Sequence, residues 1–512
     1  MRFNEKAQNP RKTVNYEEAI TYKLTPELEL YTAVCCASLQ PKFYEPNVSA
    51  QLEQIRKLIA KVDADFVKKL AIYAREQMYL RSIPLVLAVE LARIGKLDKK
   101  TVFRIIQRAD EITEILAYYQ MANERTETKK LNKLSEAIQK GIKEVFESGK
   151  FDEYQYAKYN RDTEIKLRDA LFLTHPKPKD KKQEILFKKI AENTLEIPYT
   201  WEVELSRLGQ QKFESEKDKK KAFKEKWEEL IDSGRLGYMA MLRNLRNFLE
   251  YKVSDKHIDK VCQRISNPDE VKKSKQLPFR FFSAYRRLTE ANISHFRLQD
   301  ILDALENAII ASVENVKGFD LDTKVLIACD VSRSMMTAIS KNSIVQYYDI
   351  GLLLGQLLQY KCRRIITGFF GSIWEPVILP KNNILQNTLT LRNREGVVGY
   401  STNGYKVLEW MIERRINADK IMFFTDCQLW DSDRYSYGHS SQMSELWNKY
   451  RKEINPNARL YLFDLAGYGT TPLDVITEKN VFLIAGWSDK IFDVLDNIER
   501  GKSVIEIIRN YN

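Results

Sequence analysis

Residues 324–336 read KVLIACDVSRSMM, which combines an apolar run with a polar loop. Val325 to Ala328 form a continuous apolar run, typical of a strand that is buried on both faces. Asp330, Ser332 and Ser334 follow at alternate positions, so their side chains project to one side while the backbone stays extended. Open α/β sheets bind ligands just beyond the carboxyl ends of their strands, and such oxygen donors suit Mg²⁺ or Mn²⁺. Alone this motif is weak evidence, because polar loops often follow strands.

Two later segments strengthen the metal interpretation. The apolar run of residues 421–425, IMFFT, ends directly before Asp426. Between the two runs, residues 400–404 read YSTNG, a turn-rich segment that precedes a helical pattern. Few carboxylates would leave a bound cation with positive charge and an open position for an acidic group of a partner. The five predicted ligands of a divalent metal are Asp330, Ser332, Ser334, Thr402 and Asp426.

The order and spacing of these three loops resemble the metal-ion-dependent adhesion site of von Willebrand factor A domains. One departure is Asn403, where many relatives have an acid. Alternating strand and helix patterns over residues 319–512 favour an α/β domain with a mostly parallel sheet, as in Rossmann-like folds. We expect later strands at 364–370, 420–425, 459–463 and 481–484, and helices at 343–360, 405–415, 443–454 and 490–499. Residues 377–379 form a short run, and residues 385–392 are ambiguous.

Length and composition place the chain in a broad class. Its 512 residues suggest about three domains. Hydrophobic residues make up 44% and charged residues 30%, as in an ordinary soluble globular protein. No apolar run reaches the roughly 18 residues of a membrane span, and the start lacks an apolar signal region. Two adjacent cysteines and four scattered ones, without metal spacing, fit reduced thiols, and the four histidines make zinc chemistry a poor prediction. We therefore expect a cytoplasmic protein without membrane contact.

The positive charge is unevenly distributed. Of the net charge of +12, residues 1–320 carry +10. A basic balance favours partners that bear phosphate, although a lysine-rich solvated surface explains the charge about as well.

Residues 26–315 show apolar positions at three- and four-residue spacing almost throughout. Short amphipathic helices in succession, without strands, predict an α-solenoid of helix pairs. Residues 1–25 are expected to be an irregular lead-in, and Gly318 to Asp320 a linker. The first helices are predicted at 27–39, 49–61, 64–79, 83–94, 99–109, 112–121 and 131–147.

Residues 151–182 mix cations with aromatic rings, and this combination of side chains is typical of sites that bind single-stranded nucleic acid. Cations neutralise phosphates while rings offer stacking faces; the alternative is a solvated helix face that ends at a proline. Further along, two arginines three residues apart share one helix face. The predicted RNA-binding residues are Lys158, Tyr159, Arg161, Lys166, Arg168, His175, Lys177, Arg243 and Arg246.

Three segments, LRSIPLVLAVELAR (80–93), LRDALFLTHPKP (167–178) and GYMAMLRNLRN (237–247), precede the A domain in the order seen in TROVE-domain proteins. The chain is thus similar to relatives of the Ro autoantigen, of the bacterial Ro type. The resemblance implies a monomeric ring of HEAT-like helical repeats (residues 26–318) that the A domain (residues 319–512) closes. It also implies binding of non-coding RNA: small Y RNAs outside, and single-stranded ends of misfolded RNAs in a basic central hole.

The leading hypothesis is a non-enzymatic RNA-binding scaffold in RNA quality control or processing, with an exoribonuclease or another protein as a partner at the metal site. The alternative is a metal-dependent protein-interaction module that binds no RNA. A metal-dependent hydrolase is the weakest hypothesis, because the motif places no general base and few carboxylates.

Overall fold

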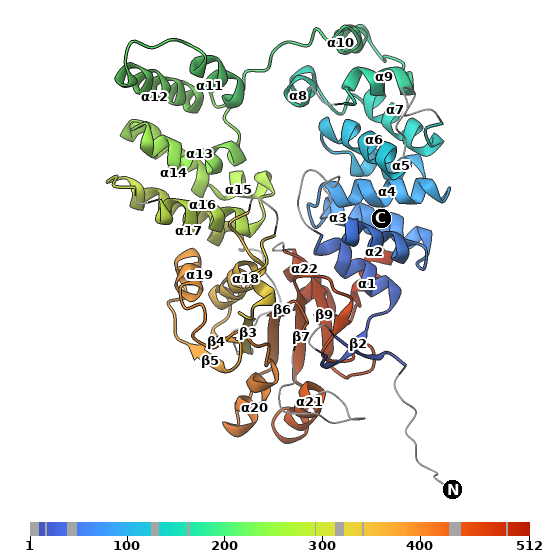
Figure 1. The fold of residues 1–512 in the computed structure, drawn as a ribbon, viewed down its shortest axis with the longest axis vertical. Helices are drawn as coiled ribbons and strands as arrows, with labels where there is room; N and C mark the ends of the chain where they lie inside the picture. The colour runs from blue at the N-terminus through green and yellow to red at the C-terminus, as the bar shows by residue number, and fades with distance from the viewer. Residues whose placement is uncertain are drawn as a thin grey trace. The chain divides into compact units, whose positions relative to one another are not determined.

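Figure 1 shows the computed structural model of the chain, which describes residues 10–15, 18–37, 49–123, 133–160, 164–291, 293–312, 322–339, 343–429, 442–487 and 490–512. The chain divides into two compact units. Unit 1 contains residues 1–38 and 227–504, and unit 2 contains residues 39–226 and 505–512. Within the described residues, no helix is long and apolar enough to cross a membrane.

A six-stranded sheet forms the core of unit 1, in the order β5-β4-β3-β6-β7-β9. All neighbours are parallel except β4 and β5. The central strands are apolar along their whole length because helices cover the sheet, and β3 and β6 are buried at nearly every position. The strands are β3 (Lys324–Asp330), β4 (Arg364–Phe370), β5 (Trp374–Val377), β6 (Lys420–Thr425), β7 (Arg459–Asp464) and β9 (Val481–Ala485).

The helices that follow these strands complete the α/β part of unit 1. Helix α18 (Tyr347–Lys361) packs against β3, β4 and β6, and its residues are almost all buried. The ambiguous residues 385–392 form a helix, α19 (Ile384–Arg392). The remaining elements are η2 (Ser334–Met336), α20 (Tyr405–Glu413), α21 (Gln442–Glu453) and α22 (Ile491–Glu499). The predicted strands and helices of this part are therefore present, with ends that differ by a few residues.

The irregular lead-in expected for residues 1–25 is wrong in part. Strands β1 (Lys12–Val14) and β2 (Ile20–Lys23) pair with each other, and β2 pairs with β8 (Thr470–Thr471) in a separate three-stranded sheet. Helix α1 (Pro26–Cys35) then lies against β9, where the Tyr31 hydroxyl donates to the Ala485 carbonyl over 3.3 Å and accepts from the Ala485 amide over 3.1 Å. The N-terminal segment thus belongs to the core of unit 1.

Helices alone build the rest of the described chain. Each presents an apolar face to its neighbours, and polar side chains cap several helices, as Asp63 does when it accepts from the Phe66 amide. In unit 1 these are α13 (Tyr238–Glu250), α14 (Asp255–Ser266), α15 (Pro268–Ser274), α16 (Pro278–Glu290) and α17 (Leu298–Ser312). In unit 2 they are α2 (Ser49–Ile59), α3 (Ala64–Glu76), α4 (Ser82–Arg93), α5 (Lys99–Ile105), α6 (Asp110–Ala122), α7 (Glu136–Ser148), α8 (Glu153–Tyr159), α9 (Leu167–Thr174), α10 (Lys181–Glu192) and α11 (Trp201–Gly209). Helix α12 (Glu216–Asp232) crosses from unit 2 to unit 1, and α23 (Val504–Arg509) begins with the last residue of unit 1 and continues in unit 2.

The predicted fold class, a mostly helical first part with a C-terminal α/β part, is confirmed. The linker predicted at Gly318 to Asp320 and the start of the helix predicted at 131–147 lie outside the described residues. The closed ring and the domain bounds stay predictions.

Candidate metal centre and nucleic-acid interface

The predicted metal ligands follow β3 and β6, which are neighbours in the sheet. Asp330 is the last residue of β3 and Asp426 directly follows β6; both are completely buried. The Ser332 and Ser334 hydroxyls lie 3.2 Å apart. The Thr425 hydroxyl donates to the Asp330 carboxylate over 2.7 Å, which ties the end of β6 to the end of β3. Asp330, Ser332, Ser334 and Asp426 are therefore gathered at one edge of the sheet.

Thr402 reaches the same edge through its loop. The Arg333 amide donates to the Tyr400 carbonyl over 3.2 Å, which joins the first loop to the second. On the other side, a Cβ at Gly404 would lie 2.7 Å from the Leu429 side chain, so the second loop also touches the third. Thr402 itself is 5% exposed. The three loops thus form one contiguous structure.

Asn403, the departure from the A-domain pattern, anchors its loop through hydrogen bonds to residues 371 and 372. Its amide nitrogen donates to the Ser372 carbonyl over 3.1 Å, and its backbone amide donates to the Gly371 carbonyl over 2.9 Å. A Cβ at Gly371 would lie 2.2 Å from the Gly399 carbonyl oxygen, so only glycine fits there. Asn403 therefore fixes the loop that carries Thr402 to the β4–β5 turn.

The electrostatics of this edge favour a cation. Burial, and next the charge of Asp426, raise the pKa of Asp330 to about 7. A third carboxylate that sequence reasoning missed, Asp464 at the end of β7, is also fully buried, and burial raises its pKa to about 7. The Asp464 carboxylate accepts from the amides of Ala466 and Gly467 over 3.0 and 2.8 Å. Three buried acids at one edge repel one another unless protons or a metal offset their charge.

The donor set decides which cation fits. Within the described residues, no group of three or more His, Cys, Asp and Glu side chains is arranged to hold a metal ion. A site here therefore needs the serine and threonine hydroxyls beside the aspartates, and such all-oxygen sets suit Mg²⁺ or Mn²⁺ better than Zn²⁺. The residues present fit a divalent metal of this kind.

The predicted RNA-binding residues of unit 2 lie on α8, α9 and the loop that follows. Lys158, Arg168, His175 and Lys177 are exposed, Lys166 is half-buried, and Arg161 lies outside the described residues. His175 ends α9 in the left-handed conformation, with φ of 46° and its ring in solvent. The predicted cations are thus mostly accessible.

The aromatic partners differ from the prediction. The Tyr159 ring, predicted to stack on a base, is half-buried and already carries the Arg108 guanidinium 4.4 Å from its centroid. Phe172, which sequence reasoning missed, is 56% exposed. It lies four residues after Arg168, so these two side chains share one face of α9, and His175 follows at the end of the helix. A cation and an exposed ring on one helix face, with an exposed imidazole at the end of the helix, suit a single-stranded nucleic acid.

Arg243 and Arg246, the two predicted RNA-binding residues of unit 1, are both exposed on α13. Arg246 forms an ion pair with Glu250 over 2.6 Å on the same helix. Only Arg243 therefore presents its charge without a carboxylate partner among the described residues.

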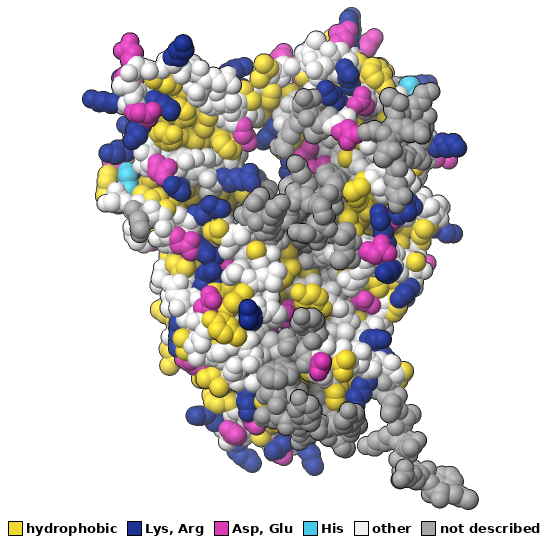
Figure 2. Space-filling view, in the orientation of Figure 1, with side chains coloured by type: hydrophobic (Ala, Val, Ile, Leu, Met, Phe, Trp, Pro, Cys, Tyr) yellow, Lys and Arg dark blue, Asp and Glu magenta, His cyan; other side chains and the backbone are white. Residues whose placement is uncertain are grey.

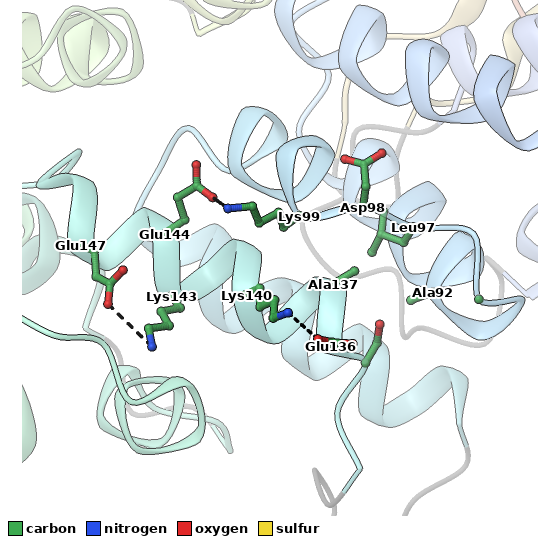
Figure 3. A pocket seen from close by; sticks show the side chains of 12 residues that line it. Ala92, Leu97, Asp98, Lys99, Glu136, Ala137, Lys140, Lys143, Glu144 and Glu147 are labelled. Atoms are coloured by element: carbon green, nitrogen blue, oxygen red, sulfur yellow. Dashed lines mark ion pairs between the residues drawn. The ribbon is translucent and has the colours of Figure 1, made fainter.

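A cavity of about 830 Å³ lies in unit 2 beside α7, the helix of residues 136–148 (Figure 3). Its charged side chains largely pair with each other: Lys99 with Glu144 over 3.0 Å, Lys143 with Glu147 over 3.8 Å, and Lys140 with Glu136. Acidic side chains outnumber basic ones along its walls, so it does not suit a phosphate-bearing ligand.

Comparisons with known proteins agree with this architecture. The TROVE domain family matches residues 34–222 and 193–301. The chain is 28% identical over 349 residues to telomerase protein component 1 of Rattus norvegicus, covering 51% of this chain and 13% of that protein. The Mus musculus protein of the same name is 27% identical over 333 residues, covering 51% and 12%. The chain thus spans about an eighth of the length of these relatives.

The fold has a counterpart among solved structures. The crystal structure of the Deinococcus radiodurans RO (RSR) protein matches with a TM-score of 0.57 at 15% identity, covering 91% of this chain and 99% of that one. Because the family match spans more than half of the 512 residues, the chain belongs to the TROVE-domain family.

Proposed function

We propose that this protein binds single-stranded RNA through the face of unit 2 that carries Arg168, Phe172 and His175, and acts as a non-enzymatic scaffold in RNA quality control or processing. The observation that carries the proposal is the exposed Phe172 ring on α9, one helical turn after the exposed Arg168 and before the exposed His175 at the helix end. The net charge of +10 over residues 1–320 supports it, since phosphates are attracted to this part of the chain. Membership of the TROVE family points the same way. The RNA ligands are non-coding RNAs, with Y-like RNAs and the ends of misfolded RNAs as the classes to test first.

Filter binding of a single-stranded RNA across a salt series tests this proposal. Each phosphate that a cation neutralises contributes about −0.7 to the log–log salt slope. Replacing both Lys166 and Arg168 by alanine should therefore make the slope shallower by about 1.4. The matched control is the double alanine variant of Lys219 and Lys221, which are paired with Glu216 and Glu225 on α12 and should leave the slope unchanged. Equal slopes in all three proteins would place the RNA site elsewhere.

The rings are tested separately from the charges. Base stacking on an aromatic side chain is worth about 1–3 kcal/mol per base, so Phe172→Ala should weaken binding about 5- to 150-fold at an unchanged salt slope. His175→Ala should also weaken binding without changing the slope. If Phe172→Ala binds as tightly as the wild type, the exposed ring has no part in recognition.

We further propose that Asp330, Ser332, Ser334, Thr402 and Asp426 hold one Mg²⁺ or Mn²⁺, which accepts an acidic group of a protein partner such as a nuclease. The gathering of these oxygens at a buried acidic edge favours this second role. RNA affinity should survive Asp330→Ala, because the phosphate-facing cations belong to the helical part. Loss of RNA binding in a folded Asp330→Ala protein would refute this division of roles.

A further inference from the structure

Two arginines of unit 1 are placed together without an acid between them. Helix α13 packs against α16, and Arg243 on α13 lies near Arg280 in the first turn of α16. Arg243 is exposed, whereas Arg280 is half-buried, with its guanidinium 4.9 Å from the centroid of the Phe279 ring. Figure 2 shows Lys and Arg side chains grouped over this part of the molecule, around α13, α15 and α16.

Two neighbouring arginines on these helices, Arg246 and Arg286, are neutralised. Arg246 pairs with Glu250 over 2.6 Å, and Arg286 pairs with Glu290 over 2.6 Å and with Asp349 over 3.4 Å. Within the described residues, neither Arg243 nor Arg280 has an ion pair or a side-chain hydrogen bond. Burial, and next the charge of Arg243, lower the pKa of Arg280. Folding therefore brings two cations together, and no carboxylate among the described residues pairs with either of them.

A phosphate group suits such a pair of cations. Guanidinium groups bind phosphate oxygens through two parallel hydrogen bonds, and a planar guanidinium that rests on an aromatic ring is held in a fixed orientation. Two guanidinium groups from different helices can contact different oxygens of one phosphate. A phosphodiester offers this charge without a matching base requirement, so the pair would hold RNA of any sequence.

We propose that Arg243 and Arg280 form a clamp for one backbone phosphate of bound RNA. This inference rests on the proposed RNA-binding function and adds a contact in unit 1, with Arg280 as a residue that sequence reasoning did not select. Because the two side chains share one phosphate, losing either should remove most of the contact.

The test measures binding of a fluorescent twelve-nucleotide oligouridine by anisotropy, with Arg243→Gln, Arg280→Gln, the double variant, and Arg500→Gln as the matched control. Each of the first two should weaken binding about five- to twentyfold and make the salt slope shallower by about 0.7, the value for one phosphate of a single strand. The double variant should lose little more than either single variant. Arg500→Gln should bind within about twofold of the wild type, since the charge of Arg500 is paired with Asp496 over 2.8 Å.

Thermal unfolding of the same proteins without RNA separates a binding role from a structural one. Arg280→Gln relieves the repulsion, so its melting temperature should equal or exceed that of the wild type; a clear decrease would mean that Arg280 supports the fold, and would overturn the clamp. If the wild type binds the RNA and both single variants bind it with the same affinity, the clamp is overturned and the proposed function stands. Absence of wild-type binding would refute both. Inorganic phosphate that stabilises the wild type but not the variants, with RNA affinity unchanged, would reassign the pair to a small anion.

Discussion

Replacing Glu111 by alanine should open the helical layers of unit 2 around α3 and α6. The Glu111 side chain is completely buried and accepts from four groups. Its carboxylate lies 2.8 and 3.2 Å from Nη2 of Arg75, and it also accepts from the amides of Gln107 and Arg108 over 2.7 and 3.0 Å. A half-buried Arg81 completes the set over 3.4 Å. Removing the carboxylate therefore leaves a buried cation and two amides without their acceptor.

The magnitude follows from these contacts. Breaking a buried ion pair by removing one partner costs about 3–5 kcal/mol, because the other charge stays buried. Arg75 is 6% exposed, so water offers little relief. The two amides lie at the start of α6, and we expect water to reach them once the loop loosens. We therefore expect a loss of about 4 kcal/mol in the local opening free energy, which is roughly a thousandfold in an opening equilibrium.

Hydrogen exchange of the intact protein measures this loss segment by segment. Exchange in α3 and α6 should accelerate by about a hundred- to a thousandfold in Glu111→Ala, whereas β3 and β6 in unit 1 serve as the internal reference. Glu111→Gln keeps an acceptor oxygen and should lose less. The double variant Arg75→Met with Glu111→Leu removes both charges and should recover most of the protection. Acceleration below tenfold in Glu111→Ala would refute the reasoning.

Further outcomes can be checked on the same protein. Burial, partly opposed by Arg81, raises the pKa of Glu114 from 4.5 to about 7, so the folded state binds this proton more tightly than the unfolded state. The stability that this protonation contributes is complete below about pH 4.5 and is lost as the pH rises to about 7, by at most about 3 kcal/mol. Glu114→Gln should remove this part of the pH dependence, and an unchanged unfolding profile between pH 4.5 and 7 would contradict the assignment. Mg²⁺ at a hundredfold excess over its dissociation constant should stabilise the wild type by about 2.7 kcal/mol and leave Asp330→Ala unaffected, as measured by thermal unfolding with and without chelator; equal shifts would place the metal elsewhere.

The sequence predicted the central sheet well because its strands are marked locally. A run such as residues 420–425 is apolar at each of its inner positions, and buried parallel strands need little else to be recognised. The three ligand loops could be paired because parallel strands end at one edge. Helix ends were less accurate: α1 ends at Cys35 rather than at 39, since apolar periodicity continues past the last turn.

Features that depend on distant residues were missed. Strand β2 has four residues and pairs with two threonines at 470–471. No pattern within residues 1–25 indicates this distant partner. Asp464 follows an apolar run like that of Asp426, but no motif marked it. Phe172 was not selected because an aromatic residue in a helix is more often core than surface, and only the packing of α9 shows which face it occupies.

The pairing of β2 with β8 can form only late in synthesis, because the two strands lie far apart in the sequence. The Thr21 hydroxyl donates to the Thr471 carbonyl, 450 residues further along the chain. At about 5–20 residues per second, a ribosome needs roughly 20–90 s to make the segment between them. Tyr511 likewise donates to Glu76 in unit 2, 435 residues away. During that interval each unit lacks the C-terminal segment that packs against it, so apolar surface is exposed. We therefore expect nascent chains of this protein to depend on chaperones until residues 471 and 511 have left the ribosome.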